Sequence, residues 1–141
     1  MSGLNIIVKT IMSTKIFTIG KDDSIKTLIN IFEHVKFHHV PVLDENKLVG
    51  LISETELLRK MTQYPITKKN HSEMNFKIHQ VMDRNPITIQ QSDTIRTAID
   101  NFLTSNIGCM PVVTKSGELK GMLSWKDVLQ MTVKKIGVDT T

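Results

Sequence analysis

The sequence of 141 residues predicts a mixed α/β (α+β) fold made of two copies of one β-α-β-β-α unit. A segment that reads as strand, turn, strand and helix at 39–57 returns with different surface residues at 109–128. Matching residues keep their order at an offset of 70, and at 71 after one extra residue in the second turn. We therefore interpret the chain as a tandem duplication. The matched pairs include Met12 with Met82, Ile25 with Ile95, Phe32 with Phe102, Pro41 with Pro111, Gly50 with Gly121 and Ser53 with Ser124.

The first half of each copy is predicted to be a short apolar segment, a strand and a helix. The apolar segments, at 8–12 and 78–82, both end in methionine, and strands are expected at 17–19 and 87–89. We predict Asp22 and Ser92 as the helix N-caps, because their side-chain oxygens can accept hydrogen bonds from the first free N–H groups. Apolar residues then recur at helical spacing and predict one buried stripe on each helix. These stripes are Ile25, Leu28, Ile29 and Phe32, and Ile95, Ala98, Ile99, Phe102 and Leu103.

The second half of each copy is predicted to be a β-hairpin followed by a helix. The turns at 44–47 and 114–118 are rich in turn-forming residues. Pro41 and Pro111 lack an N–H group, so we expect them at a strand start or on an edge strand. The closing helices are expected at about 54–62 and 125–135.

These elements predict a single module over 1–141. Its first motif spans 8–62, a polar connector containing Pro65 spans 63–77, and its second motif spans 78–135. A unit of about 60 residues leaves one face of its small sheet uncovered. We therefore expect the two motifs to pack through their sheets around a shared core, with pseudo-twofold symmetry.

Composition narrows the class of protein. The chain is 40% apolar and 23% charged, as in globular proteins. It lacks an apolar run of the ~20 residues that a membrane span requires, and its start does not resemble a signal peptide. The single cysteine, Cys109, excludes an intrachain disulfide and suits a reducing compartment, so we expect a cytoplasmic protein without membrane association. The net charge of +4 comes from scattered lysines, which disfavours a nucleic-acid partner.

A serine followed three residues later by an acid opens each closing helix: Ser53 with Glu56, and Ser124 with Asp127. A serine at this position offers free N–H groups and the positive end of the helix dipole to a phosphate. A carboxylate one turn further on can accept hydrogen bonds from two ribose hydroxyls. The same spacing also describes a capping box, in which the serine and the acid satisfy each other's backbone donors. The residues alone leave both interpretations open.

Taken together, the two copies resemble a tandem pair of CBS domains, also called a Bateman module. The resemblance covers about 8–131 and depends on the ordered set of a Pro-Val strand, a Gly-x-x-Ser turn and an acid three residues on, found twice. It implies two clefts for adenosine-containing ligands: AMP, ADP, ATP, S-adenosylmethionine or adenine dinucleotides. It also implies a non-catalytic regulatory module that forms a homodimer and signals to a separate effector protein.

The resemblance implies the residues of two ligand sites. At the second site, Ser124 would meet the phosphate and Asp127 the ribose, with Lys126 adding a charge-assisted contact to phosphate. The base pocket of this site would be lined by Ile87, Thr88, Cys109 and Met110. The corresponding residues of the first site are Ser53, Glu56, Phe17, Thr18, His39 and Val40. Glu56 replaces the family's usual Asp, and its extra methylene moves the carboxylate outward, which disfavours ribose binding at the first site.

The sequence does not favour an enzyme. We find no nucleophile–base pair, no paired acids and no phosphate-binding glycine loop, and we expect no metal or catalytic cofactor. His34 and His38 have a spacing that can bind metal on a helix but lack a further ligand nearby. Cys109 is expected to be a buried thiol. The main alternative is a structural dimerisation or interaction module with no ligand, which Glu56 and the capping-box interpretation favour.

Overall fold

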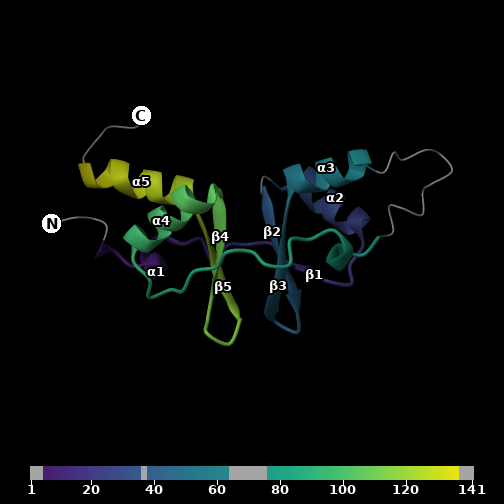
Figure 1. Cartoon of the computed structure of the whole chain (residues 1–141), viewed down its shortest axis with the longest axis horizontal. Helices are drawn as coiled ribbons and strands as arrows, with labels where there is room; N and C mark the ends of the chain where they lie inside the picture. Colours follow the sequence, from purple (N-terminus) through teal and green to yellow (C-terminus); the bar gives the residue numbers. More distant parts are fainter. Residues whose placement is uncertain (1–4, 36–37, 64–75, 137–141) are drawn as a thin grey trace. The chain divides into compact units, whose positions relative to one another are not determined.

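The computed structural model describes residues 5–35, 38–63 and 76–136, and Figure 1 shows the path of the chain. The predicted helix–hairpin–helix order occurs twice, so the prediction of a mixed α/β fold is confirmed. Most of the predicted connector at 63–77 lies outside the described residues. The elements are α1 (Val8–Ile11), β1 (Ile19–Gly20), α2 (Ile25–His34), β2 (His39–Asp44), β3 (Lys47–Ser53), α3 (Glu54–Gln63), the 3-10 helix η3 (Ile78–Gln80), α4 (Ile95–Ser105), β4 (Cys109–Val113), β5 (Leu119–Ser124) and α5 (Trp125–Ile136).

The chain forms two compact units whose boundaries do not follow the repeat. Unit 1 combines Met1–Ile16 with Ile87–Thr141, and unit 2 is Phe17–Pro86. The segment that opens each copy in the sequence therefore belongs to the compact unit that holds the body of the other copy. This exchange shapes the surroundings of both candidate sites.

In unit 1, α1 is docked onto the body of the second copy by backbone hydrogen bonds. The N–H of Val8 donates to the carbonyl of Asp93, and the N–H of Ile95 donates to the carbonyl of Ile6, both at 2.8 Å. Ser13 and Met122 exchange a pair of backbone hydrogen bonds, each of 2.9 Å. Val8 is fully buried in the core of this unit. The opening segment is thus an integral part of unit 1.

In unit 2, the segment around η3 is docked in the same way. The N–H of Ile78 donates to the carbonyl of Asp23 at 2.8 Å, which repeats the bond between Val8 and Asp93. Leu51 and Asp83 exchange backbone hydrogen bonds of 3.0 and 2.8 Å, in the manner of Ser13 and Met122. The two units therefore share one docking geometry.

The sheets are small. In unit 2 the strand order is β1-β2-β3, with β1 parallel to β2 and β2 antiparallel to β3. In unit 1, β4 and β5 form an antiparallel pair, and Ile89 adds one parallel bridge to Val112. The predicted strands at 17–19 and 87–89 are thus shorter than expected: only Ile19 and Ile89 of these segments pair.

The two prolines explain why these strands are short. Ile89 donates to the carbonyl of Pro111 and accepts from the N–H of Val113. One step back along this parallel ladder, the carbonyl of Ile87 would need an N–H from Pro111, which proline lacks. In unit 2, β1 likewise pairs only from Val42 onward, although Pro41 lies in the central strand of its sheet. The prediction of a strand start or an edge strand for Pro41 was therefore wrong, since Pro41 is the third residue of the central strand, but its missing donor still ends the ladder.

The predicted N-caps were wrong by two residues. The caps of α2 and α4 are Ser24 and Thr94, whose side chains accept from the N–H groups of Thr27 and Thr97. The carboxylates of Asp23 and Asp93 instead accept from the N–H groups of Gly20 and Gln90, at 2.8 Å each. Because these aspartates close a turn before each helix, the helix begins later than the sequence pattern suggested.

Each unit has its own hydrophobic core, built from the predicted helix stripes and the strands. The core of unit 1 is Val8, Ile89, Ile95, Ala98, Phe102, Met110, Val112, Leu123 and Val128. The core of unit 2 is Ile19, Ile25, Leu28, Val40, Val42, Ile52, Leu57, Ile78 and Val81. Leu103 is the exception to the predicted stripes, since 78% of its surface is exposed.

Within the described residues, no helix is long and apolar enough to cross a membrane.

Candidate functional site

The two serine–acid turns lie where the last hairpin strand meets the closing helix. Ser53 ends β3 and Ser124 ends β5, and α3 and α5 begin at the next residue. Each serine hydroxyl accepts a hydrogen bond from the N–H three residues on, at 3.0 Å for Ser53 and 3.2 Å for Ser124. Both serines therefore cap their helices.

Only the second copy closes the capping box. The carboxylate Oδ2 of Asp127 accepts from the backbone N–H of Ser124 at 2.9 Å, so the two residues satisfy each other. Among the described residues, the other carboxylate oxygen, Oδ1, has no hydrogen-bond partner. Capping thus uses one of the two carboxylate oxygens of Asp127.

In the first copy, the carboxylate turns away from the cap. Oε1 of Glu56 accepts from the guanidinium of Arg59 at 2.8 Å, one turn further along α3. Within the described residues, the Glu56 carboxylate accepts no hydrogen bond from the backbone N–H of Ser53. The first turn is therefore half a capping box with an exposed ion pair.

A strand residue faces each serine across the hairpin. His39 pairs with Ser53 in the β2–β3 register, and Cys109 pairs with Ser124 in the β4–β5 register. Burial raises the pKa of the Cys109 thiol to about 12, and the negative charge of Asp127 adds to this effect. Burial, together with neighbouring His38, lowers the pKa of His39. Both side chains therefore favour their neutral forms at neutral pH.

The other predicted site residues differ in accessibility. The side chains of Val40 and Met110 are fully buried in their cores, so only their backbones can meet a ligand. Within unit 1, Ile87 and Thr88 are exposed just before the bridge at Ile89, and Lys126 is exposed on the first turn of α5. Within unit 2, Phe17 and Thr18 are exposed just before β1.

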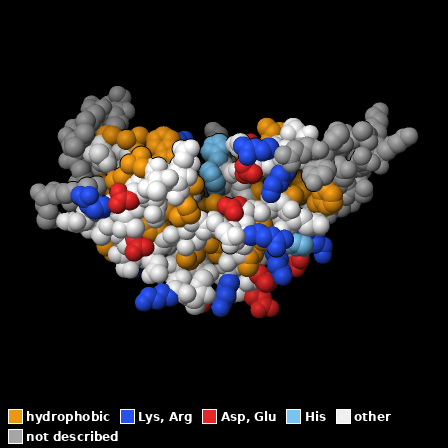
Figure 2. Space-filling view, viewed as in Figure 1, with side chains coloured by type: hydrophobic (Ala, Val, Ile, Leu, Met, Phe, Trp, Pro, Cys, Tyr) orange, Lys and Arg blue, Asp and Glu red, His pale blue; other side chains and the backbone are white. Residues whose placement is uncertain are grey.

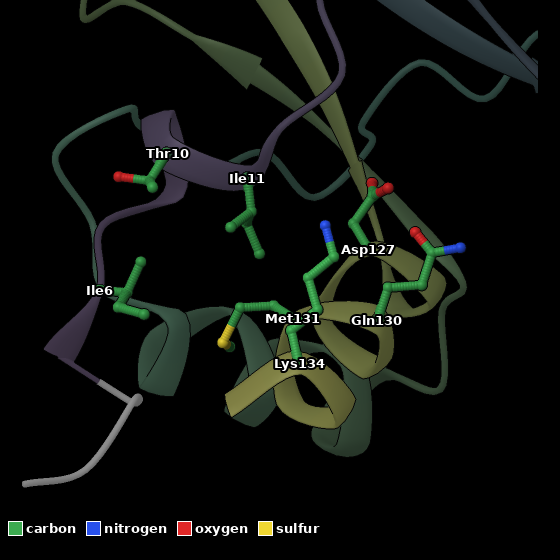
Figure 3. Close-up of a pocket in the computed structure, with 7 residues that line it drawn as sticks. All are labelled: Ile6, Thr10, Ile11, Asp127, Gln130, Met131 and Lys134. Atoms are coloured by element: carbon green, nitrogen blue, oxygen red, sulfur yellow. The ribbon is translucent and has the colours of Figure 1, made fainter. Parts of the chain in front are cut away.

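Unit 1 contains a pocket of about 580 Å³ between the opening segment and α5. Figure 3 shows Thr10 and Ile11 on one side and the residues of α5 on the other. Of the predicted site residues, only Asp127 lines this pocket. The full lining is Ile6, Thr10, Ile11, Asp127, Gln130, Met131 and Lys134.

Sequence reasoning missed six of these seven lining residues. The spacing of Asp127, Gln130, Met131 and Lys134 places them on one face of a helix, and this signal could have been used. Ile6, Thr10 and Ile11 carry no comparable signal, because they reach the pocket only through the exchange of the opening segment.

The described residues hold no group of three or more His, Cys, Asp or Glu side chains that could bind a metal ion. The Nδ1 atom of His34 lies 2.8 Å from the carbonyl of Asn30. The Nδ1 atom of His38 instead pairs with Oε2 of Glu54 at 3.2 Å. The two histidines considered for a metal therefore have separate local partners.

Comparison with known proteins agrees with the sequence repeat. The model of the CBS domain family matches residues 8–63 and 78–134, which is most of the chain. The chain belongs to the CBS-domain family. The resemblance to a tandem CBS pair is confirmed, and the two matched segments are the two copies of the sequence repeat.

One relative matches this CBS pair over nearly its whole length. A CBS domain-containing protein of Dictyostelium discoideum is 29% identical over 137 residues, which cover 93% of this chain and 94% of that protein. Protein MJ1225 of Methanocaldococcus jannaschii is 26% identical over 140 residues, covering 92% of this chain but only 50% of that protein. The CBS pair thus spans about half the length of the second relative.

Solved structures with the same fold include proteins crystallised with adenosine-containing ligands. The CBS domain pair of protein MJ0100, in complex with 5′-methylthioadenosine and S-adenosyl-L-methionine, has a TM-score of 0.75 and 26% identity, covering 90% of this chain and 99% of that one. CBSX2 in complex with AMP has a TM-score of 0.79 and 21% identity, covering 92% of this chain and 97% of that one. At 21% identity, CBSX2 is similar in fold alone.

Proposed function

We propose that this CBS pair is a non-catalytic regulatory module that binds an adenosine-containing ligand through the second copy. The observation that carries the proposal is the position of Asp127. Its carboxylate is held by the capping box, and it also lines the pocket of unit 1. An acceptor held in this way is suited to ribose hydroxyls, because a fixed group loses little freedom when it binds.

The pocket fits a nucleoside in size and chemistry. Its volume of about 580 Å³ is within the range of about 300–1,000 Å³ that is usual for small-molecule sites. Ile6, Ile11 and Met131 give it apolar surface for a base, while Asp127 and Thr10 supply polar atoms. The adenosine-containing ligands bound by MJ0100 and CBSX2 support this choice of ligand class.

A second arrangement of the ligand, outside this pocket, would use the residues around the turn, since apart from Asp127 none of them lines the pocket. In that arrangement the Ser124 hydroxyl and Lys126 would meet phosphate, and Ile87, Thr88, Cys109 and the backbone of Met110 would border the base. The corresponding first site, with Ser53, Glu56, Phe17, Thr18, His39 and Val40, is the weaker candidate. Its acid is already engaged by Arg59 and does not close the capping box.

The regulatory output would pass to another protein. A ligand that contacts both α5 and the opening segment binds best when these two parts are docked, and it therefore shifts the population toward that state. We propose that a separate effector protein reads this shift, and that the chain works as a homodimer in the cytoplasm. AMP, ADP, ATP and S-adenosylmethionine are the candidate signals.

A second candidate function is a dimerisation or interaction module without a ligand. The complete capping box accounts for Ser124 and Asp127 without any nucleotide. In addition, Leu103, Trp125 and Leu129 expose 78%, 49% and 52% of their surfaces on α4 and α5. Figure 2 shows hydrophobic side chains at the surface in the region of these helices. Exposed apolar side chains of this kind favour a protein partner.

A thermal-shift screen separates the two candidates. The purified chain is heated with AMP, ADP, ATP, S-adenosylmethionine or cyclic di-AMP. A ligand at 100 times its dissociation constant should stabilise the folded state by about 2.7 kcal/mol and raise the melting temperature. A shift with one ligand, reduced by Asp127→Ala, supports the sensor. If a well-folded sample shows no shift with any ligand, and light scattering finds a dimer, the interaction module is favoured.

A further inference from the structure

We infer that Lys134 selects the ligand of this pocket, and that it favours an adenosine with an anionic 5′ group over one with an uncharged 5′ group. The inference rests on the proposed function. It adds a specificity-determining residue that lies beyond the repeated serine–acid turn, near the end of α5. The ligand class that it identifies is a 5′-phosphorylated nucleoside.

The first argument is placement. Of the seven lining residues, only Asp127 and Lys134 carry a charge, and the charges are opposite. They are seven residues apart on α5, which is close to two helical turns and puts them on one face. A ligand in the pocket therefore meets both a hydrogen-bond acceptor and a cation from the same helix.

The second argument is the direction of the lysine side chain. Long side chains on a helix lean toward its N-terminal end. Figure 3 shows Lys134 extended in that sense, with its amine directed toward the space between Ile11 and Asp127. About 10.5 Å of helix rise separates the two Cα atoms, and the lysine stem spans much of it. The amine thus faces the part of the pocket next to the proposed ribose position.

The third argument is that the cation is available. Within the described part of the chain, Lys134 forms none of the five ion pairs, and Asp127 forms none either. Other lysines have local partners: Lys21 pairs with Asp44 at 3.4 Å, and Lys120 with Glu118 at 3.9 Å. A ligand anion would therefore not have to displace a protein carboxylate from Lys134.

These features discriminate between ligands. Asp127 accepts from hydroxyl groups and repels anions, so it suits the ribose and keeps a phosphate away from itself. Lys134 attracts the phosphate by a charge-assisted hydrogen bond. Adenosine and 5′-methylthioadenosine can satisfy Asp127 but offer nothing anionic to Lys134. We therefore expect AMP to bind more tightly than either, by roughly tenfold or more.

The test is isothermal titration calorimetry of the full chain with AMP, adenosine and 5′-methylthioadenosine. The variants are Lys134→Met, which keeps much of the apolar stem, and Lys134→Arg, which keeps the charge. The matched control is Lys115→Met, in the exposed β4–β5 turn of the same unit. We expect Lys134→Met to weaken AMP roughly tenfold and to leave adenosine unchanged. Lys134→Arg and Lys115→Met should both keep the preference for AMP.

The outcomes separate the inference from the proposed function. If AMP and adenosine bind equally well to the wild-type chain, or if Lys134→Met weakens both alike, the inference is overturned while adenosine binding stands. If none of the three compounds binds a folded sample, the inference fails, and the proposed function fails with it when ADP, ATP and S-adenosylmethionine do not bind either. Circular dichroism spectra and melting temperatures of the variants show whether each sample is folded.

Discussion

The two serine–acid turns have the same backbone but different chemistry. In the second copy, the carboxylate of Asp127 reaches back 2.9 Å to the N–H of Ser124. In the first, the longer side chain of Glu56 bonds with Arg59 at 2.8 Å and leaves the box half closed. The acid is thus held at the end of the strand in the second copy and extends along the helix in the first. The copy with the shorter acid is the better candidate for a ligand site.

The side chains next to the two turns also differ between the copies, although the backbone there is the same. The N–H of Glu54 donates to the carbonyl of His38 at 3.0 Å, and the N–H of Trp125 donates to that of Gly108 at 3.2 Å. The side chains on this common frame are a hydrogen-bonded histidine and glutamate in one copy and an indole beside a glycine in the other. Duplication has preserved the backbone frame while the side chains that could meet a ligand have diverged.

The largest effect should come from a feature that the copies share. A Cβ atom at Gly121 would lie 2.7 Å from the carbonyl oxygen of Ser13, and one at Gly50 would lie 2.9 Å from that of Asp83. Because both obstacles are backbone, we expect Gly121→Ala and Gly50→Ala each to lower the free energy of unfolding by about 1–3 kcal/mol. Urea denaturation measures the loss.

Gly108→Ala is the matched control for the glycine variants, since its Cβ would meet Trp125 at an ordinary 3.5 Å. It should change the free energy of unfolding by less than about 0.5 kcal/mol. If Gly121→Ala were as harmless as Gly108→Ala, the opening segment would not be docked tightly against β5. If only one of Gly50→Ala and Gly121→Ala destabilised the chain, the two copies would not share their docking geometry.

The second prediction separates the copies. Asp127→Ala removes the return bond of the capping box and should destabilise the chain by about 1 kcal/mol. Glu56→Ala removes only an exposed ion pair and should stay within about 0.5 kcal/mol. The affinity for the best adenosine ligand should fall roughly tenfold with Asp127→Ala and remain unchanged with Glu56→Ala. Equal effects of the two variants on both quantities would remove the distinction between the turns.

Much of this comparison could be predicted from the sequence, because it depends on short-range patterns. Helical spacing, hairpin turns and the Ser-x-x-acid spacing are local, and they identified the repeat, the closing helices and the positions of Ser124 and Asp127. The docking of α1 onto the second copy was not predictable in this way. The N–H of Val8 bonds with a residue 85 positions later, Asp93, and no periodicity within the segment records that partner.

Smaller errors have local physical causes. The N-caps moved from Asp22 and Ser92 to Ser24 and Thr94, because Asp23 and Asp93 close a turn first. Leu103 continues the apolar spacing of α4 but lies near its C-terminal end, and it is exposed. Spacing alone therefore overestimates how far a buried stripe extends. The pocket wall formed by Ile6, Thr10 and Ile11 could not be predicted without the exchange of segments.

The third prediction uses the residues that face the two serines. Burial, aided by His38, lowers the pKa of His39 below its usual value of 6.5. The unfolded chain therefore takes up this proton at a higher pH than the folded chain, and stability falls as the pH drops below about 6.5. Replacing His39 with Gln should flatten this loss when melting temperatures are compared between pH 8 and 5. Cys109→Ser should leave the loss in place.

The raised pKa of Cys109 predicts the opposite pH dependence of stability for the second copy. Burial and Asp127 raise its pKa from 9.0 to about 12, so the unfolded chain releases the proton first as the pH rises. Stability should fall progressively above about pH 9, and Cys109→Ser should reduce that loss relative to the wild-type chain. Melting temperatures between pH 8 and 10.5 provide the measurement. If His39→Gln altered the alkaline loss and Cys109→Ser the acidic one, the assignment of the two residues would be reversed.

The smallest effect is expected from a substitution that converts the first turn into the second. Glu56→Asp shortens the acid, so its carboxylate can reach the N–H of Ser53 as Asp127 reaches that of Ser124. The new hydrogen bond should contribute about 0.5–1.5 kcal/mol, offset by loss of the Arg59 pair, for a net gain of a few tenths of a kcal/mol. Urea denaturation in parallel with Asp127→Glu, which should lose a similar amount, gives the matched measurement. If Glu56→Asp stabilises the chain while Asp127→Glu destabilises it, the methylene alone controls the cap. If both variants are neutral, the turns differ because of their surroundings, and the side chains of His38 and Trp125 become the next positions to exchange.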